Sequence, residues 1–305
     1  MGYTDHFKFD REPFSNAPNE KFYFDSDQHN QALLRLKYSV DTDKGLAVLV
    51  GGVGTGKTTL ARRMLDNLPY DKYESSLLVM IHSAITPEWI MSRICTQLGV
   101  KNPDISPLKM LKQLFERLLE IEKEGRKAVV LIDEAQMLQT RELMEEFRGL
   151  LNLEIPDKKL LNIIFFGLPE LDNVMKLDAP LAQRVAFKYT LTPLSTQATL
   201  AYINHRLQVA KCEVSPFHED ALALIHQFSG GVPRLINTIC DNALFETYLR
   251  HASEVSAEIV NNVAEDLGFV SVGLTLAPEE VSSSEPEPED EFEDIEVFFE
   301  GLEEK

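Results

Sequence analysis

Cysteine is scarce in this sequence, and the few cysteines present do not cluster. The three Cys, at positions 95, 212 and 240, lie far apart in apolar or helical contexts, without a CxxC pair or a Cys–His group. This spacing excludes a disulfide scaffold and a zinc ribbon. The seven His also lack the spacing of metal ligands, such as HxxxH. Reduced, buried thiols in a cytoplasmic protein are the simplest interpretation.

Basic residues and long apolar runs are lacking as well. Lys and Arg number 30 against 49 Asp and Glu, which gives a formal net charge of -19. This balance excludes a protein whose whole surface binds nucleic acid through phosphates, although it leaves room for a local basic patch. The most apolar stretch, residues 267–277, is shorter than the ~18 residues of a membrane span, and residues 1–10 lack a signal-peptide core. We therefore expect a soluble, cytoplasmic protein.

Much of the negative charge lies at the end of the chain. Residues 278–305 hold 13 acidic residues against one Lys, and their opening is rich in Pro, Ser and Glu. Such a composition cannot form a core and predicts a disordered acidic tail over residues 271–305. Apolar residues recur within it at helical spacing: Phe292, Ile295, Phe298, Phe299 and Leu302. They predict a short amphipathic docking helix, and a solubilising tail with incidental aromatics is the equally supported alternative.

The body alternates between two patterns. Short apolar runs, typical of strands buried on both faces of a parallel sheet, occur at 46–50, 77–81, 128–132 and 162–166, with a more alternating run at 185–191. Helical patterns lie between them, at 58–68, 87–98, 107–122 and 140–151. This alternation predicts a doubly wound α/β domain over residues 1–192.

The strand patterns stop after Pro193. Four helical patterns follow, at 195–209, 219–228, 233–249 and 256–267, with Ser195 and Ser256 as helix caps and Gly230-Gly231 as a break. We expect a small all-helical domain over residues 193–270. A chain of this length is typically divided into about two domains.

One motif predicts a nucleotide site. Residues 51–58, GGVGTGKT, fit G-x-x-x-x-G-K-[ST] between a predicted strand and a predicted helix. Glycines let the backbone amides point at phosphate oxygens, and the start of the helix adds partial positive charge. Lys57 should reach the β- and γ-phosphates, and Thr58 should bind Mg²⁺. The candidate contacts are Gly52, Val53, Gly54, Thr55, Gly56, Lys57, Thr58 and Thr59. A plain Gly-rich turn is the weaker alternative.

A second motif places two acids at the end of a buried strand, in AVVLIDE at residues 128–134. Asp133 can hold Mg²⁺ at the carboxyl edge of the sheet. Glu134 can take a proton from the attacking water or orient it. A phosphate-binding loop alone fits a kinase, whereas the adjacent acid pair favours water as the nucleophile and therefore hydrolysis of a nucleoside triphosphate.

Two arginines follow in suggestive positions. Arg184 precedes the last strand, where it could reach the γ-phosphate bound by a neighbouring subunit. Arg234 stands at a helix start in GVPR, where it could contact phosphate within the same chain. An ordinary surface charge is the alternative interpretation of each.

These motifs occur in an order that resembles the AAA+ superfamily: the phosphate loop, DEAQ at 133–136, FFGLPEL at 165–171, QRV at 183–185 and GVPR at 231–234. The opening, residues 3–36, narrows the resemblance to the ExeA-like ATPases of general secretion pathway A. It covers roughly residues 3–268. It implies an ASCE sheet with a helical lid, ATP and Mg²⁺ at their junction, Arg184 as a finger toward a neighbouring subunit and Arg234 as the lid sensor.

Two departures and one further candidate accompany the resemblance. The family's fourth strand usually ends in GQPEL, but this chain has Leu168, whose side chain cannot hydrogen-bond to a γ-phosphate. Since the acidic, Phe-bearing tail stands where the secretion members continue into a membrane span and a peptidoglycan-binding region, we do not expect membrane anchoring or wall binding to transfer. In AAA+ proteins the segment before the first helix often lies against adenine, so Pro13 and Phe14 are candidates, with plain packing equally plausible.

The leading hypothesis is therefore an ATPase switch that assembles into a ring or filament. It would act on a protein partner in secretion, pilus or surface-polysaccharide export, and that partner could recruit it to the inner face of the membrane. One alternative is a DNA-associated AAA+ ATPase like the regulators of transposition, which the acidic charge disfavours. Another is a nucleotide-bound scaffold with little turnover, which Leu168 keeps open.

Overall fold

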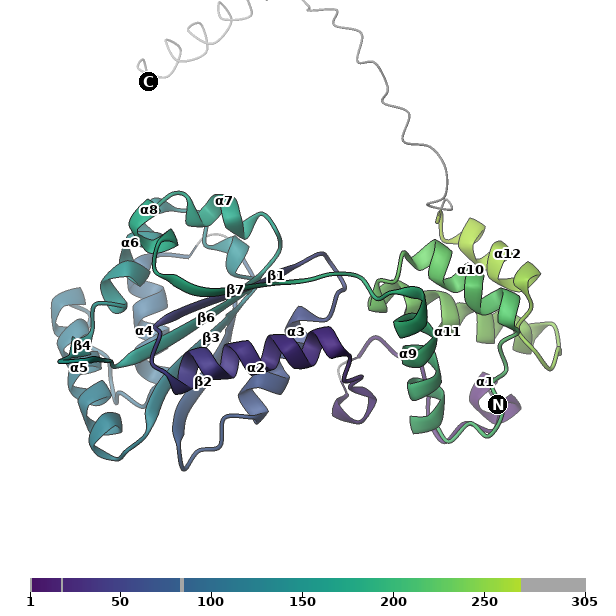
Figure 1. The fold of residues 1–305 in the computed structure, drawn as a ribbon, viewed down its shortest axis with the longest axis horizontal. Coiled ribbons are helices and arrows are strands. Elements are labelled where there is room, and N and C mark those ends of the chain that lie inside the picture. The colour runs from purple at the N-terminus through teal and green to yellow at the C-terminus, as the bar shows by residue number, and fades with distance from the viewer. Residues whose placement is uncertain (1, 18, 83–84, 270–305) are drawn as a thin grey trace, which may run out of the picture. The chain divides into compact units, whose positions relative to one another are not determined.

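A parallel sheet organises the first part of the chain. In the computed structural model, which describes residues 2–17, 19–82 and 85–269, five strands form one sheet in the order β2-β3-β6-β1-β7 (Figure 1). The strands are β1 (Leu46–Gly51), β2 (Tyr73–Val79), β3 (Lys127–Asp133), β6 (Leu161–Gly167) and β7 (Val185–Leu191). All their pairings are parallel. The predicted α/β class with a parallel P-loop sheet is thereby confirmed.

Alternate residues of each central strand face opposite helical layers. Ala47 and Leu49 of β1 pack on one side with α2 (Asp27–Asp41) and α3 (Lys57–Asp66). Leu46, Val48 and Val50 pack on the other side, which is covered by α4 (Pro87–Gln97), α5 (Pro107–Lys123), α6 (Arg141–Leu150), α7 (Leu171–Met175) and α8 (Ala179–Ala182). Because both faces are covered, the strands are continuously apolar, which is the pattern that made them predictable.

The second part of the chain is helical. It comprises α9 (Thr196–Val209), α10 (Glu219–Ser229), α11 (Pro233–Leu249) and α12 (Ala257–Asp266). Ser195 and Ser256 cap α9 and α12, with each hydroxyl accepting a hydrogen bond from a backbone amide of the first turn. These helices share one apolar core. A Pro at the start of α11 and a left-handed Gly230 at the end of α10 fix the break between those two helices.

The beginning of the chain packs with the helices rather than with the sheet. Tyr3 in α1 (Tyr3–His6), Phe9 and Phe14 are buried in the core of the helical region. Phe14 is 1% exposed and meets the Phe217 ring edge to face at 5.9 Å. The first residues thus pack with the helices that follow the sheet, although they precede the sheet in the sequence. The domain boundary at residue 192 stays a prediction.

Several elements differ from the sequence-based expectation. Strand β2 begins at Tyr73, four residues before the predicted start at Leu77. Its first half, YESS, is mostly polar because β2 lies at an edge of the sheet, so the apolar pattern did not reveal it. Helix α2, the turn η1 (Glu20–Phe22), the turn η2 (Ala135–Met137) and the hairpin of β4 (Glu154–Ile155) and β5 (Lys158–Lys159) were not predicted. The predicted acidic tail, residues 271–305, and its docking helix lie outside the described residues.

Two further findings concern the described part of the chain. No helix there is both long and apolar enough to cross a membrane. All three cysteines are free thiols. Cys95 and Cys240 are fully buried, and burial raises the pKa of each thiol, to about 11 for Cys95.

Candidate nucleotide-binding site

The glycine-rich loop joins β1 to α3 in a tight curl. Gly54 and Gly56 adopt left-handed backbone angles, with φ of 76° and 101°, and Gly56 is the residue that precedes α3. A Cβ atom at Gly56 would lie 3.0 Å from the ring of His29, so this position has no room for a side chain. The Thr55 hydroxyl donates a hydrogen bond to the Gly52 carbonyl at 2.9 Å. The loop thus curls tightly at the start of a helix, which is the setting in which backbone amides and a helix N-terminus bind phosphate oxygens.

Lys57 is buried at the beginning of α3. It is 5% exposed, and its Nζ donates to the Gly52 carbonyl at 2.9 Å across the loop. Burial lowers the pKa of Lys57, while the charges of Glu134 and Asp133 act in the opposite direction. Lys57 is therefore a desolvated cation in the loop, and the two neighbouring acids partly compensate its charge.

Asp133 ends β3 as a fully buried carboxylate. It is 0% exposed, and its Oδ1 accepts a hydrogen bond from the Glu134 amide at 3.0 Å. Its Oδ2 has no hydrogen-bond partner among the described residues. Burial raises the pKa of Asp133, and the neighbouring Thr58 hydroxyl acts in the opposite direction. A buried carboxylate oxygen without a partner, beside a hydroxyl, is a suitable pair of ligands for a hard cation such as Mg²⁺.

Glu134 follows in a left-handed conformation, with φ of 55°. Non-glycine residues rarely adopt this conformation, and they do so chiefly where the surroundings hold them in place. Its Oε2 accepts a hydrogen bond from Gln136 Nε2 at 2.6 Å, and its side chain lines the cavity described next.

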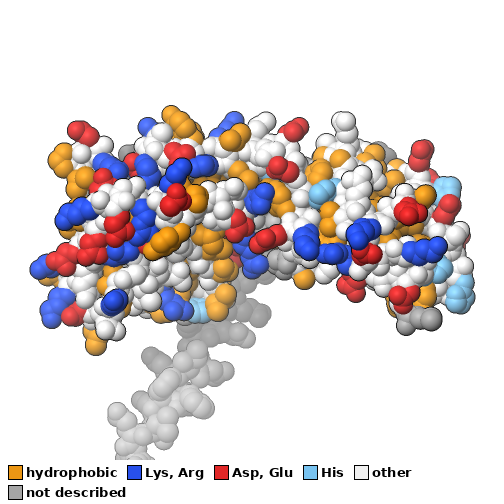
Figure 2. All heavy atoms as spheres, turned by 90° about the horizontal axis from the view of Figure 1, so that it is seen from below, with side chains coloured by type: hydrophobic (Ala, Val, Ile, Leu, Met, Phe, Trp, Pro, Cys, Tyr) orange, Lys and Arg blue, Asp and Glu red, His pale blue; other side chains and the backbone are white. Residues whose placement is uncertain are grey.

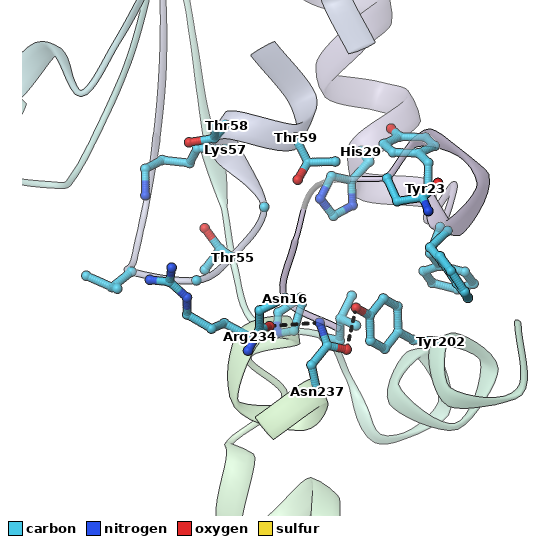
Figure 3. A pocket seen from close by; sticks show the side chains of 18 of the residues that line it. Asn16, Tyr23, His29, Thr55, Lys57, Thr58, Thr59, Tyr202, Arg234 and Asn237 are labelled. Carbon is cyan, nitrogen blue, oxygen red and sulfur yellow. Dashed lines mark hydrogen bonds between the residues drawn. The ribbon is translucent and has the colours of Figure 1, made fainter. Parts of the chain in front are cut away.

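A cavity of about 450 Å³ lies against the glycine-rich loop (Figure 3). Its walls come from the loop, from the segment at 15–24 that precedes α2, and from helices α9 and α11. The volume is that of a small-molecule site. Lys57, Thr58 and Thr59 lie toward one end, and Tyr202 and Asn237 lie toward the other.

The end of the cavity away from Lys57 is built from linked polar side chains. Tyr202 donates from its hydroxyl to Asn237 Oδ1 at 2.8 Å, and Asn237 donates from Nδ2 to Asn16 Oδ1 at 3.1 Å (Figure 3). Arg206 also donates to the Tyr202 hydroxyl, at 2.8 Å. These hydrogen bonds hold the side chains of Tyr202, Asn237 and Asn16 together in the wall of the cavity.

Pro13 and Phe14 do not line the cavity. The backbone carbonyl of Pro13 accepts a hydrogen bond from Arg206, and Phe14 is buried in the helical core. The packing alternative is therefore where the structure places them, and the cavity wall begins one residue later, at Ser15.

Arg234 lies at the junction of the loop and the helical region. Its backbone amide donates to the Gly54 carbonyl at 3.3 Å, and a Cβ atom at Gly54 would lie 2.8 Å from Arg234 Cβ. The side chain is exposed and extends along the loop in the cavity (Figure 3). The structure thus brings Arg234 together with the loop residues, in the same chain.

Arg184 lies at the amino-terminal end of the parallel strands, whereas the glycine-rich loop lies at their carboxyl-terminal end. It precedes Val185, which pairs with Leu46 at the start of β1, whereas the glycine-rich loop follows the end of β1. Its guanidinium donates to Asn152 Oδ1 at 2.6 Å and to the carbonyl of Arg148 at 3.1 Å. It therefore cannot reach the cavity of its own chain.

Sequence reasoning missed part of the site. Asn16, Tyr23, His29, Tyr202 and Asn237 line the cavity without belonging to a motif. The only signal was the position of Asn16, two residues after Phe14, which was proposed to contact the base. Leu168 also lines the cavity, and its backbone amide donates to Gln136 Oε1 at 3.0 Å.

Comparison with known proteins finds similarity to the AAA domain family and to a protein of general secretion. The AAA domain family matches residues 40–175. General secretion pathway protein A of Aeromonas hydrophila is 39% identical over 256 residues, which are 83% of this chain and 46% of that protein. The chain thus spans less than half the length of this relative.

Solved structures share the fold at low identity. Cdc6p from Pyrobaculum aerophilum aligns with a TM-score of 0.65 at 19% identity, covering 86% of this chain and 72% of that one. The Aeropyrum pernix ORC2 protein, in its ADPNP-ADP complexes, aligns with a TM-score of 0.61 at 16% identity, covering 84% and 72%.

Proposed function

This chain is an AAA+ ATPase family member related to general secretion pathway protein A, and on that premise we propose that it binds and hydrolyses ATP with Mg²⁺ as an assembling switch. The observation that carries the proposal is that Lys57, in the glycine-rich loop, lies close enough to Asp133 and Glu134 to feel both charges, and that Lys57 and Glu134 line one cavity. Few other functions require a buried cation beside two adjacent acids at the end of a strand, one of them with a carboxylate oxygen that has no hydrogen-bond partner among the described residues.

The triphosphate lies along the loop from Gly52 to Thr59. The amides and the start of α3 stabilise its negative charge, and Lys57 exchanges its bond to the Gly52 carbonyl for phosphate oxygens. The base occupies the far end of the cavity, near Asn16, Tyr202 and Asn237. This assignment replaces Pro13 and Phe14, which the cavity does not reach.

Thr58 and Asp133 would hold Mg²⁺, through the hydroxyl and the partnerless Oδ2. When bound, the ion would neutralise charge on the phosphates. Glu134 accepts a proton from the attacking water, or orients that water, from its place on the cavity wall. Arg234 contacts the phosphates in the same chain and links the helical region to the bound nucleotide.

Arg184 acts on a neighbouring copy. Because it lies at the end of the sheet opposite its own loop, it can stabilise transferred charge only in another subunit's site. Assembly into a ring or filament then completes each site. ATP binding favours the assembled state, and hydrolysis relaxes it.

The change between the assembled and the relaxed state acts on a protein partner in a secretion, pilus or surface-polysaccharide export system. The name of the relative supports the secretion setting, and the partner places the protein at the cytoplasmic face of the membrane. On the face shown in Figure 2, Lys and Arg side chains lie among Asp and Glu, with exposed apolar side chains between them. Such a mixed surface favours a protein partner over a nucleic acid.

The central experiment is the substitution Glu134→Gln. We expect it to retain ATP affinity but to lower kcat by about 10²-fold or more, because a general base contributes ~10²–10⁴ to a rate. ATP-bound assemblies should accumulate, as measured by light scattering at high protein concentration. Glu265→Gln, an exposed change on α12, is the matched control and should leave turnover unchanged.

A second variant tests the loop. Lys57→Ala removes the buried cation and should abolish nucleotide binding in titration calorimetry. Wild-type protein that neither binds nor cleaves ATP at high concentration with magnesium contradicts the proposal as a whole. Turnover by Glu134→Gln at the wild-type rate contradicts only the role of Glu134.

A further inference from the structure

Gln136 is a buried polar side chain that the proposed function leaves unused. It is 8% exposed and lies in η2, the short turn directly after the acid pair that ends β3. Glu134 and Leu168 line the cavity, and Gln136 lies between these two residues rather than in the lining. Its role must therefore be exerted through its neighbours.

Its amide group makes two hydrogen bonds of opposite sense. Nε2 donates to Glu134 Oε2 at 2.6 Å, and Oε1 accepts from the Leu168 backbone amide at 3.0 Å. A backbone N–H can only donate and a carboxylate can only accept, so the orientation of the Gln136 amide is determined by its partners. No other uncharged side chain of this length carries both a donor and an acceptor in this arrangement.

The end of β6 is shaped to permit this contact. A Cβ atom at Gly167 would lie 3.0 Å from Gln136 Oε1 and 3.0 Å from a methyl group of Leu171. Any side chain at position 167 would therefore press on the amide of Gln136. The glycine leaves the space that the bond to Leu168 needs.

We propose that Gln136 is a positioning residue for hydrolysis, which fixes the Glu134 carboxylate and couples it to the turn that follows β6. This inference rests on the proposed function. Glu134 has three rotatable side-chain bonds and an irregular backbone, so regular structure does not set the direction of its carboxylate. The bond to Gln136 anchors one carboxylate oxygen and leaves the other free for water.

The coupling also explains how position 168 can be linked to Glu134 although the side chain of Leu168 is apolar. At this position the chain offers the phosphate end of the cavity no polar side chain, but its backbone amide is tied through Gln136 to Glu134. A shift of the turn after β6 on nucleotide binding therefore moves the acid. The link from ligand to acid runs through the main chain instead of through a side chain at position 168.

The first test is the substitution Gln136→Met, which keeps the length of the side chain and removes both hydrogen bonds. We expect kcat to fall about tenfold to a hundredfold, since small misplacement of a catalytic group costs up to ~10² in rate. The nucleotide Kd should stay within about twofold, because Gln136 does not touch the ligand. Gln139→Met, the same change at an exposed position three residues away, should leave both values unchanged.

Two further variants separate positioning from general stability. Gly167→Ala should lower kcat in the same way with Gln136 intact, because the new methyl group displaces its amide. In a Glu134→Gln background, Gln136→Met should cause no further loss of the residual single-turnover rate, because the two residues act as one unit. The Leu168 amide should also lose protection in hydrogen exchange in Gln136→Met, with or without nucleotide.

The outcomes are distinct. Wild-type protein with turnover, together with a Gln136→Met variant of unchanged kcat, overturns the positioning role alone. A loss of equal size in the Glu134→Gln background, or an unchanged Leu168 amide, overturns it as well. Wild-type protein without any turnover contradicts the proposed function, and this role with it.

Discussion

His29 is a titratable side chain buried behind the phosphate loop. It is 6% exposed, its Nδ1 lies 2.6 Å from the Ser26 hydroxyl, and its ring fills the space beside Gly56. Burial lowers the pKa of His29, while its interaction with the Thr55 backbone and the charge of Asp25 act in the opposite direction. The folded protein therefore favours the neutral ring.

This shift predicts a pH dependence of stability. As pH falls below about 6.5, the unfolded chain protonates position 29 while the folded protein does not, so the free energy of unfolding decreases. In His29→Gln this contribution is absent, and the decrease between about pH 7.5 and 5.5 should be smaller than in the wild type. Urea denaturation at the two values measures it. His82→Gln, an exposed change, should keep the wild-type slope, and an equal slope in His29→Gln would contradict the assignment.

At the residue scale, the sequence predicted the site residues that stand together in short motifs. It missed the site residues that come together only in the folded chain. Lys57, Thr58 and the acid pair at 133–134 stand in short motifs whose spacing reflects one loop and one strand end. Asn16 and Asn237 come from segments more than two hundred residues apart, and their hydrogen bond exists only in the folded chain. Arg184 was identified as a candidate by position, but its place at the far end of the sheet required the strand register.

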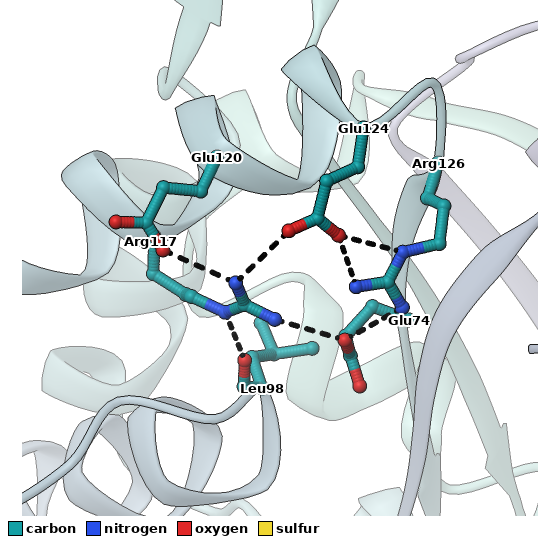
Figure 4. Close-up of polar contacts among 6 residues, drawn as sticks. All are labelled: Glu74, Leu98, Arg117, Glu120, Glu124 and Arg126. Atoms are coloured by element: carbon teal, nitrogen blue, oxygen red, sulfur yellow. Dashed lines mark hydrogen bonds and ion pairs between the residues drawn. The ribbon is translucent and has the colours of Figure 1, made fainter.

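At the scale of elements, a buried ion network joins β2, α4 and α5 (Figure 4). Glu74 Oε2 on β2 accepts from Arg126 at 2.8 Å and from Arg117 at 3.0 Å, and its side chain is 14% exposed. Arg117 also donates to the Leu98 carbonyl at the end of α4, at 2.8 Å. Glu74 thus holds two guanidinium groups at β2. This is the edge strand whose start was not predicted, because its first half is polar.

Removing the charge of Glu74 should loosen this corner. Glu74→Gln keeps the volume of the side chain but leaves two largely buried cations, Arg117 and Arg126, with less compensating charge. We expect a loss of about 1–3 kcal/mol in the free energy of unfolding, the range of hydrogen bonds to charged groups. Glu145→Gln breaks an exposed pair with Arg141 and should cost less than about 0.5 kcal/mol. Urea denaturation measures both, and equal losses would contradict a special role for the network.

The helices were more predictable than the edges of the sheet. Helices α5 and α11 begin at Pro107 and Pro233, and their bounds follow from a proline at the first turn and from helical spacing of apolar residues. Helix α2 was missed because its apolar residues, such as Leu36 and Val40, are separated by many polar ones. The two-residue strands β4 and β5 lie below the length at which any pattern is visible.

At the scale of the whole molecule, the sheet and the helical region meet at the phosphate loop. Gly54→Ala should push the loop and the start of α11 apart, because the new methyl group would lie 2.8 Å from Arg234 Cβ and 3.0 Å from Val232. We expect the nucleotide affinity to fall by about tenfold or more, equivalent to ~1.4 kcal/mol. Gly230→Ala is the matched control. Gly230 is also left-handed, with φ of 55°, but nothing lies within 4 Å of the added atom.

The comparison separates backbone strain from steric contact. Both variants lose roughly 1–2 kcal/mol of stability through the left-handed backbone. Only Gly54→Ala should also lose affinity in calorimetric titration of nucleotide. Equal affinities in the two variants would contradict the importance of the close approach between loop and helix. No motif predicted this contact, since it depends on how the helical region docks on the sheet.

The packing of Phe9 and Phe14 among the last helices has a consequence for biosynthesis. These rings are translated before the sheet, but the helices that cover them are translated after it. While the strands of the sheet are being synthesised, both aromatic rings are therefore without their native partners. Neither ring can be buried as in the folded protein until the helical region has also been made.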